Sequence, residues 1–426
     1  MAVLQYKGKA ILTSYKKRVV ITGLGVISPI GIGKDQYWQS LSEGKTGFKP
    51  ITLFDTSDLK VKIGGEIAGF NPVDILGKKG LIDLDRSTTL LSSATKFALE
   101  DSQIDLSNIN SPVTGISIGT TFGSLNSLSQ FDRQSLEEGP NFVNASRFPN
   151  TVVNSPASRV AIRYGVKGPN ATISTGFCAS IDALDYAIHC INANRADRVI
   201  VGAVEEMCFQ TFFGFYRLGY LSGLNNDKEP LSCPFDKRRD GIIFSEGSAV
   251  FILEDLKKAE ERKANIYAEV LGVGSNFDPF RLDKFNPKGT GIVEAIKLAL
   301  TNASLKSDDI DCVFANANST QDADAVETKA IKEVFGDKAL KIPITAIKSM
   351  IGESFSSSGA MAVAAALGSI SKDFIPPTVN LEEKDPMCDL DYVPNKARKQ
   401  NLGKVMINSF GPNGANSVLI IGKHKG

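Results

Sequence analysis

Short apolar runs rich in β-branched residues alternate along this chain with segments of helical length, and this alternation restricts the folds that it can adopt. Such runs predict buried strands, and strands separated by helices favour an α/β architecture. The predicted strands are residues 18–23, 115–119, 171–174, 198–202, 248–253, 267–273, 312–316, 405–408 and 418–421. The predicted helices are residues 87–102, 177–194, 291–302, 325–335 and the Ala- and Gly-rich run 360–370.

The pattern of strands and helices occurs twice along the chain. A first series ends near Asp255, and a charged helical segment at residues 257–262 leads to a new strand. We therefore expect an N-terminal half at residues 18–258 and a C-terminal half at residues 259–426. Residues 1–17 contain four lysines and no uninterrupted apolar segment, so they predict a frayed N-terminal extension rather than a signal peptide.

The composition is ordinary for a globular protein, with 42% hydrophobic and 22% charged residues. A formal net charge of +1 gives no general attraction to nucleic acid or to anionic membranes, and no apolar run reaches the length of a transmembrane helix. The six cysteines are scattered without a C-x-x-C pair, which favours reduced thiols in a cytoplasm. No metal site is predicted.

Several motifs occur in order along residues 18–422. They are RVVITGLGVISPIG at residues 18–31, PFDKRRDG at 234–241, IPPTVNL at 375–381, CDLDYVP at 388–394 and NSFG at 408–411. Together they resemble the β-ketoacyl-acyl-carrier-protein synthases, which are condensing enzymes of the thiolase fold. The resemblance implies two βα halves related by a pseudo-twofold axis, stacked in five αβαβα layers.

Three positions depart from the chemistry of that family: Phe177, Asn318 and Glu353. The family has a nucleophilic Cys and two His there, which hold the acyl chain as a thioester and stabilise the enolate formed from malonyl-carrier protein. A phenyl ring cannot form a thioester, an amide carries no charge near neutral pH, and a carboxylate would repel an enolate. If Glu353 is buried, we expect it to be protonated or paired, with Lys348 as the candidate partner.

Cys178 is the alternative nucleophile, because it lies one residue beyond Phe177. One helical step turns a side chain by about 100° and so away from the expected tunnel. Residues 181–184 also match the family's helix only without a gap, so a small buried thiol is the favoured interpretation. The only histidines are His189 and His424, and neither is expected to replace the missing imidazoles.

The resemblance also assigns a tunnel, a subunit interface and a closing loop. The tunnel and interface residues that it implies are Thr121, Phe122, Phe142, Phe148 and Phe177. The closing-loop residues are Phe410, Gly411, Pro412 and Asn413. Pro412 stands where the family has a mobile Phe that gates the tunnel, and it stiffens this loop. The basic residues 237–239 could meet an acidic carrier protein, although in the family this stretch is largely structural.

A chain that keeps this frame without the triad resembles the chain length factors of type II polyketide synthases. The resemblance implies a catalytically inactive subunit that forms a heterodimer with an active ketosynthase and shapes the tunnel that controls polyketide length. It would need no cofactor of its own, because the acyl carrier protein brings the phosphopantetheine. The alternatives are an active synthase or acyltransferase that uses Cys178, and a malonyl-carrier-protein decarboxylase. The decarboxylase is less favoured because such relatives keep both histidines.

Overall fold

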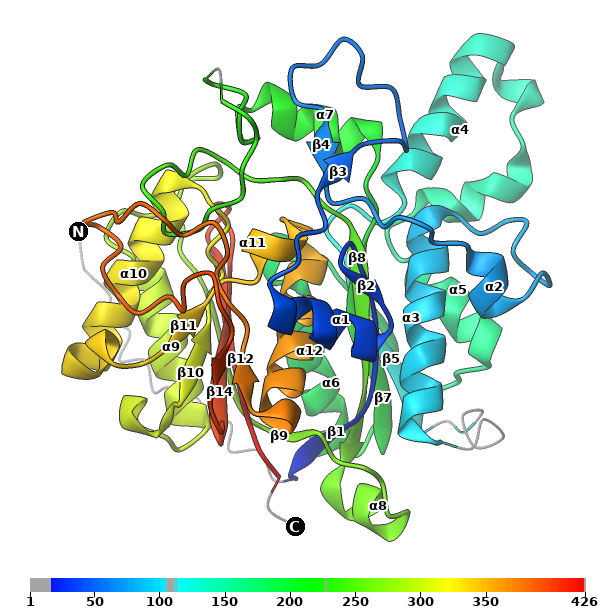
Figure 1. Cartoon of the computed structure of the whole chain (residues 1–426). Coiled ribbons are helices and arrows are strands. Elements are labelled where there is room, and N and C mark those ends of the chain that lie inside the picture. The colour runs from blue at the N-terminus through cyan, green and yellow to red at the C-terminus, as the bar shows by residue number, and fades with distance from the viewer. Residues whose placement is uncertain (1–16, 105–110, 112, 227, 425–426) are drawn as a thin grey trace, which may run out of the picture.

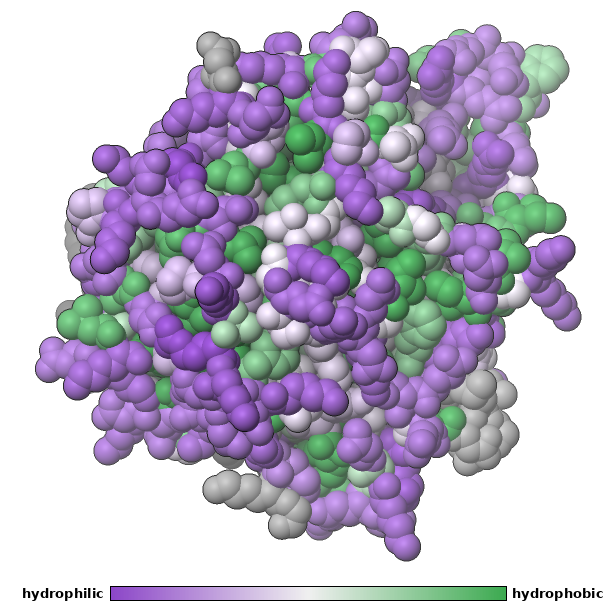
Figure 2. Space-filling model, in the orientation of Figure 1, coloured by the Kyte–Doolittle hydropathy of each residue, from purple (hydrophilic) through white to green (hydrophobic). Residues whose placement is uncertain are grey.

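The computed structural model describes residues 17–104, 111, 113–226 and 228–424 (Figure 1). The predicted extension at residues 1–17 lies outside the described residues except for Lys17. No helix in these ranges is both long and apolar enough to cross a membrane. Hydrophilic residues cover most of the face drawn in Figure 2, and the hydrophobic side chains that show on it lie in separate groups.

A mixed sheet of eleven strands runs through the molecule in the order β11-β10-β14-β15-β9-β1-β8-β7-β5-β6, with β2 paired to β1. The strands are β1 (Val19–Ser28), β2 (Gly31–Ile32), β5 (Thr114–Gly119), β6 (Asn170–Ile173), β7 (Arg198–Glu205), β8 (Gly247–Asp255), β9 (Ala268–Phe277), β10 (Cys312–Phe314), β11 (Ile344–Thr345), β14 (Lys404–Phe410) and β15 (Ala415–Gly422). Every residue of β1, β8 and β15 is buried, as expected for strands covered on both faces. Two small antiparallel sheets of two strands each lie outside this sheet: β3 (Lys49–Pro50) with β4 (Ile63–Gly64), and β12 (Phe374–Ile375) with β13 (Arg398–Lys399).

The strand pairing is the same in the two halves of the chain. In the N-terminal half, β1 is antiparallel to β8, β8 is antiparallel to β7, β7 is parallel to β5, and β5 is parallel to β6. In the C-terminal half, β9, β15, β14, β10 and β11 pair in the same order and with the same directions. The first strands of the halves, β1 and β9, pair at the junction. This repeat confirms the predicted pseudo-twofold architecture.

The helices form three layers that alternate with the two halves of the sheet (Figure 1). In the middle layer, α6 (Ala179–Asn192) packs against α12 (Ser356–Lys372). The N-terminal half is covered outside by α3 (Arg86–Ser102) and α5 (Ser155–Tyr164), and the C-terminal half by α9 (Thr290–Asn302) and α10 (Gln321–Phe335). These layers give the αβαβα order expected of a thiolase-like fold.

Smaller helices complete the described chain. They are α1 (Lys34–Glu43), α2 (Pro72–Leu76), α4 (Leu125–Glu138), α7 (Phe209–Arg217), α8 (Leu256–Glu261) and α11 (Lys348–Ile351), with 3₁₀ turns η2 (Pro140–Phe142), η3 (Ala145–Thr151) and η4 (Gly176–Cys178). The boundary predicted between residues 258 and 259 falls inside α8 and stays a prediction. Each predicted strand and helix overlaps an observed one, whereas α1, α2, α4, α5, α7 and α11 were not predicted.

Candidate functional site at the start of the two central helices

The fold brings the three departing positions to one place. Phe177 lies in η4, directly before α6, and Glu353 lies between α11 and α12, so both precede the paired central helices. Asn318 lies in the loop between β10 and α10. The Nδ2 atom of Asn318 is 3.0 Å from Glu353 Oε2, and the rings of Phe177 and Phe355 are 5.2 Å apart between centroids. The three positions therefore lie in one region of the fold.

Phe177 places a hydrocarbon ring at the position that the resemblance assigns to the nucleophile. Its carbonyl accepts a hydrogen bond from Ser409 Oγ at 2.9 Å, which fixes the turn before α6. The closing loop lies directly over the ring, because a Cβ atom added at Gly411 would be 3.2 Å from Phe177 Cδ2. The ring therefore fills the space between this loop and Phe355.

Glu353 is paired and fully engaged in hydrogen bonds. Its Oε2 atom lies 2.9 Å from Lys348 Nζ and accepts from Asn318 Nδ2, while Oε1 accepts from Phe355 N at 2.9 Å and from Ser358 Oγ at 2.8 Å. The side chains of Lys348 and Glu353 are 6% and 0% exposed. The predicted pairing of Glu353 with Lys348 is present. Both carboxylate oxygens accept hydrogen bonds from groups of this chain.

The amide of Asn318 is held by its neighbours. Its Oδ1 atom accepts from Thr320 Oγ1 at 2.8 Å, and its backbone N–H donates to Asp324 Oδ1 at 3.0 Å. Burial raises the pKa of Asp324 to about 7. The next residue, Ser319, has a φ of +74° and accepts a hydrogen bond from the Cys233 N–H at 3.1 Å. These contacts orient the amide toward Glu353.

A second buried acid, Glu327, accepts hydrogen bonds from backbone groups of the same loop. Its carboxylate accepts from the N–H groups of Asn316 and Ala317 at 2.9 and 2.8 Å and from Asn408 Nδ2 at 2.8 Å. Burial raises its pKa. Lys348 Nζ donates to Asn316 Oδ1 at 3.0 Å, so this lysine links the loop to Glu353. Lys348, Glu353, Asn316 and Asn318 thus form a connected hydrogen-bond network at the two positions where the resemblance implies imidazoles.

A cluster of phenyl rings lies next to Phe177, and the sequence analysis missed most of it. The ring of Phe355 contacts those of Phe122, Phe177, Phe215 and Phe244. These five residues come from five separate segments, so no local pattern in the sequence identifies the cluster. Phe122 was expected to line a tunnel. Its ring instead packs against the rings of Phe215 and Phe355.

Cys178 lacks the surroundings of a nucleophile. Its side chain is fully buried, its Sγ atom donates to the Ser409 carbonyl at 3.0 Å, and burial raises the pKa of the thiol. Because the thiolate is the reactive species, a raised pKa in a buried site makes a thiol inert. The structure therefore supports the interpretation of Cys178 as a small buried thiol.

Two family profiles match the chain. The profile described as "Beta-ketoacyl synthase, N-terminal domain" matches residues 16–259, and "Beta-ketoacyl synthase, C-terminal domain" matches residues 267–382. The chain belongs to the β-ketoacyl synthase family.

Named members of the β-ketoacyl synthase family are similar to this chain over nearly its whole length. A 3-oxoacyl-(acyl-carrier-protein) synthase 2 of Coxiella burnetii is 36% identical over 409 residues, covering 96% of this chain and 99% of the relative. The tetracenomycin polyketide synthase ketoacyl synthase alpha subunit of Streptomyces glaucescens is 37% identical over 418 residues, covering 96% and 98%. Among solved structures, the ishigamide ketosynthase/chain length factor matches with a TM-score of 0.90 and 32% identity, covering 96% of this chain and 100% of that one.

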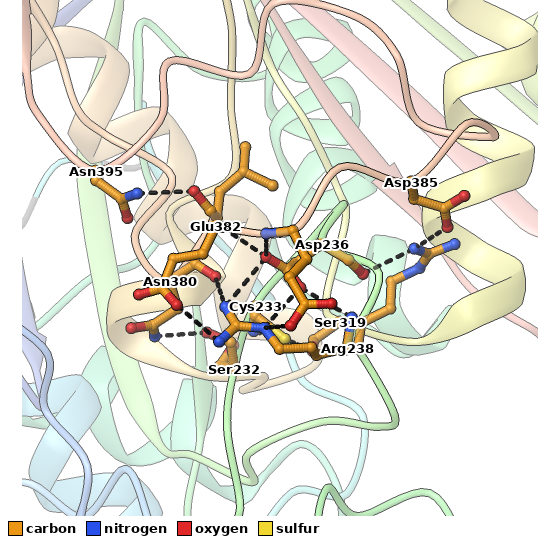
Figure 3. A network of polar contacts seen from close by, with 12 residues as sticks. Ser232, Cys233, Asp236, Arg238, Ser319, Asn380, Glu382, Asp385 and Asn395 are labelled. Carbon is orange, nitrogen blue, oxygen red and sulfur yellow. Dashed lines mark hydrogen bonds and ion pairs between the residues drawn. The ribbon is translucent and has the colours of Figure 1, made fainter.

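The basic stretch of this β-ketoacyl synthase family member is bound within its own chain. Figure 3 shows Arg238 beside Asp236, with Nε to Oδ1 at 2.9 Å, and Arg238 also reaches Glu382 at 2.8 Å. Arg239 is buried, and its Nη1 atom lies 2.5 Å from Asp385 Oδ2. The two guanidinium groups tie this loop to residues 382–385, as the structural interpretation expected for Arg238 and Arg239, whereas Lys237 is exposed.

The predicted tunnel and interface residues divide into two groups. Thr121 joins the site, because its Oγ1 atom donates to the Gly176 carbonyl at 3.2 Å. Phe142 and Phe148 lie outside the ring cluster, in the segment after α4, with exposed fractions of 71% and 58%. They do not line the interior of this chain, and their place at a subunit interface stays a prediction.

The predicted closing loop joins β14 to β15. The Gly411 N–H donates to the Ala415 carbonyl at 2.9 Å, and Phe410 is buried in the core. Pro412 and Asn413 form the turn itself. With its φ fixed by a pyrrolidine ring, Pro412 gives this turn little freedom and no aromatic ring that could swing over Phe177.

Proposed function

We propose that this chain is a catalytically inactive, chain-length-factor-type subunit that pairs with an active ketosynthase and helps to set the length of a poly-β-keto chain. One observation carries the proposal: a phenyl ring and a closed Lys348–Glu353–Asn318 network occupy the positions that the resemblance assigns to a thiol and two imidazoles. Such a site lacks both the thiol that would hold a thioester and the imidazoles that would act on malonyl-carrier protein.

The named relatives support the part of this proposal that concerns the scaffold. Relatives called synthases are as much as 37% identical to this chain, so the scaffold for condensation is kept while the reacting groups differ. A solved ketosynthase/chain length factor superimposes with a TM-score of 0.90, and a ketosynthase in complex with a type II acyl-carrier protein superimposes with a TM-score of 0.88. For this chain we therefore propose a heterodimer that works with an acyl carrier protein in the cytoplasm, the carrier bringing the phosphopantetheine.

The edge of the sheet supports pairing with a second subunit. Within the described residues β6 pairs only with β5, so its outer edge presents unpaired backbone groups that another strand could complete. Exposed apolar side chains lie in and after helix α4, at Leu136, Phe142 and Phe148. Apolar side chains of this kind mark interaction surfaces in many proteins.

Co-expression with a candidate ketosynthase partner tests the pairing. We expect the two chains to elute together at the mass of a heterodimer, and elution of this chain alone at its monomer mass would refute the pairing. Phe142→Asp should weaken the complex, whereas Lys258→Asp, a charge change on α8, serves as a control. Condensation should require the partner's own cysteine and should be absent when this chain is given malonyl-carrier protein alone.

A further inference from the structure

The ring of Phe355 forms the centre of the phenyl cluster described above. Its centroid lies 5.5 Å from that of Phe122, 5.2 Å from Phe177, 4.6 Å from Phe215 and 5.1 Å from Phe244. Phe244 and Phe355 are each 1% exposed. Separations of about 4.5–7 Å are those of rings in direct contact. The cluster therefore extends as continuous hydrocarbon from Phe177 into the interior.

The spacing of these rings leaves no passage for an acyl chain. Carbon atoms in contact lie about 3.5–4 Å apart, so a methylene chain between two rings needs centroids separated by about 7–8 Å. Each of the four separations from Phe355 is shorter, the longest being 5.5 Å. A chain could enter only if the rings of Phe177 and Phe355 moved aside.

Buried polar contacts hold Phe355 and Phe122 in place. Phe355 has a φ of +49°, a conformation that is unfavourable for a bulky residue, and its N–H donates to Glu353 Oε1 at 2.9 Å. The adjacent Ser356 donates through Oγ to Glu205 Oε1 at 2.6 Å. Glu205 Oε1 also accepts from the Thr121 N–H, at the start of the turn that carries Phe122. Glu205 is thus a positioning residue that ties two sides of the cluster together.

We propose that Phe177 and Phe355 exclude linear acyl-phosphopantetheine chains from the interior of this subunit. The inference rests on the proposed function and sharpens it. Every acyl chain that the complex elongates is then accommodated outside this interior, and the subunit influences chain length only through its surface. Phe177 and Phe355 are specificity-determining residues in this sense.

Photo-crosslinking of the full-length chain tests the exclusion. The probe is octanoyl-pantetheine with a diazirine at the end of the acyl chain, and peptide mapping by mass spectrometry locates the label. We expect no label on the peptides that contain Phe122, Phe215 and Phe244 in the wild type. In Phe177→Ala/Phe355→Leu the same peptides should gain at least about tenfold more label, because emptied apolar cavities bind apolar ligands.

The controls separate this inference from loss of folding and from the proposed function. Phe148→Ala removes the same ring from an exposed site and should leave the labelling unchanged. If the double variant does not fold, the single Phe177→Ala variant replaces it, because it opens only the half-buried end of the cluster. Label on these peptides in the wild type, or none in a folded variant, overturns the exclusion. Heterodimer mass is measured separately, so failure of pairing alone refutes only the proposed function.

Discussion

Replacing Glu353 by Gln should destabilise this protein strongly. The substitution keeps the size of the side chain and one oxygen, which still accepts from the Phe355 N–H. It removes the negative charge 2.9 Å from Lys348 Nζ. It also replaces Oε2, the acceptor for Lys348 Nζ and Asn318 Nδ2, by an amide NH₂ group. Three hydrogen-bond donors can then meet with no acceptor between them.

The burial of the pair sets the size of this effect. Because the side chains of Lys348 and Glu353 are 6% and 0% exposed, water cannot solvate the lysine once its partner is neutral. Breaking a buried ion pair on one side typically destabilises a protein by about 3–5 kcal/mol. Replacing both partners by apolar residues removes the unpaired charge, so Lys348→Met/Glu353→Leu should recover part of the loss. The recovery should be incomplete, because Asn318 Nδ2, the Phe355 N–H and Ser358 Oγ lose their acceptor.

Urea unfolding followed by tryptophan fluorescence measures the loss directly. Trp38 is the only tryptophan, and its Nε1 atom donates to the Ala364 carbonyl at 2.8 Å, so it reports on α12. Glu261→Gln is the matched control, since Lys258 and Glu261 form a pair at 3.0 Å that is largely exposed. The control should lose no more than about 1 kcal/mol. A loss equally small for Glu353→Gln would refute the reasoning.

Three further expectations concern reactivity and pH. Cys178 is buried, so iodoacetamide or an acyl-carrier thioester should modify it only after unfolding, and a stable adduct on the native chain would revive the acyltransferase alternative. Burial raises the pKa of Glu206 to about 8, so the folded chain retains a proton that the unfolded chain releases. The free energy of unfolding should therefore fall as the pH rises from about 5 to 8, and Glu206→Gln should reduce that slope by up to about 1.4 kcal/mol per pH unit. Phe177→Cys should still form no condensation product by mass spectrometry, because Asn318 and Glu353 supply no imidazole.

Much of the fold followed from local patterns in the sequence. The spacing of apolar residues predicted the helix that begins at Phe177, although its first turn is the 3₁₀ turn η4 and α6 begins at Ala179. The helix predicted at residues 325–335 begins four residues earlier, at Gln321, because Asp322 and Asp324 suit a first helical turn. Helix α7 was missed, although its residues are largely aromatic and half-buried.

Contacts within the site could be predicted where the contacting residues are close in sequence. Other site positions could be predicted only from the resemblance to the family. Lys348 and Glu353 are five residues apart, and their pairing was expected from the sequence. The contacts of Phe355 join segments that are far apart in the chain, so only the folded structure reveals them. Likewise, no pattern indicated that Phe142 lies on a segment projecting away from the site.

The shared hydrogen bonds of Lys348, Glu353 and Asn318 also bear on how such a protein can evolve. A mutation that returned histidine at only one of these positions would leave a buried lysine without its counter-charge or a carboxylate without its amide donor. Each single histidine substitution would thus disturb contacts that several buried groups share. The three side chains would therefore have to change together if this site were to change its chemistry without loss of stability.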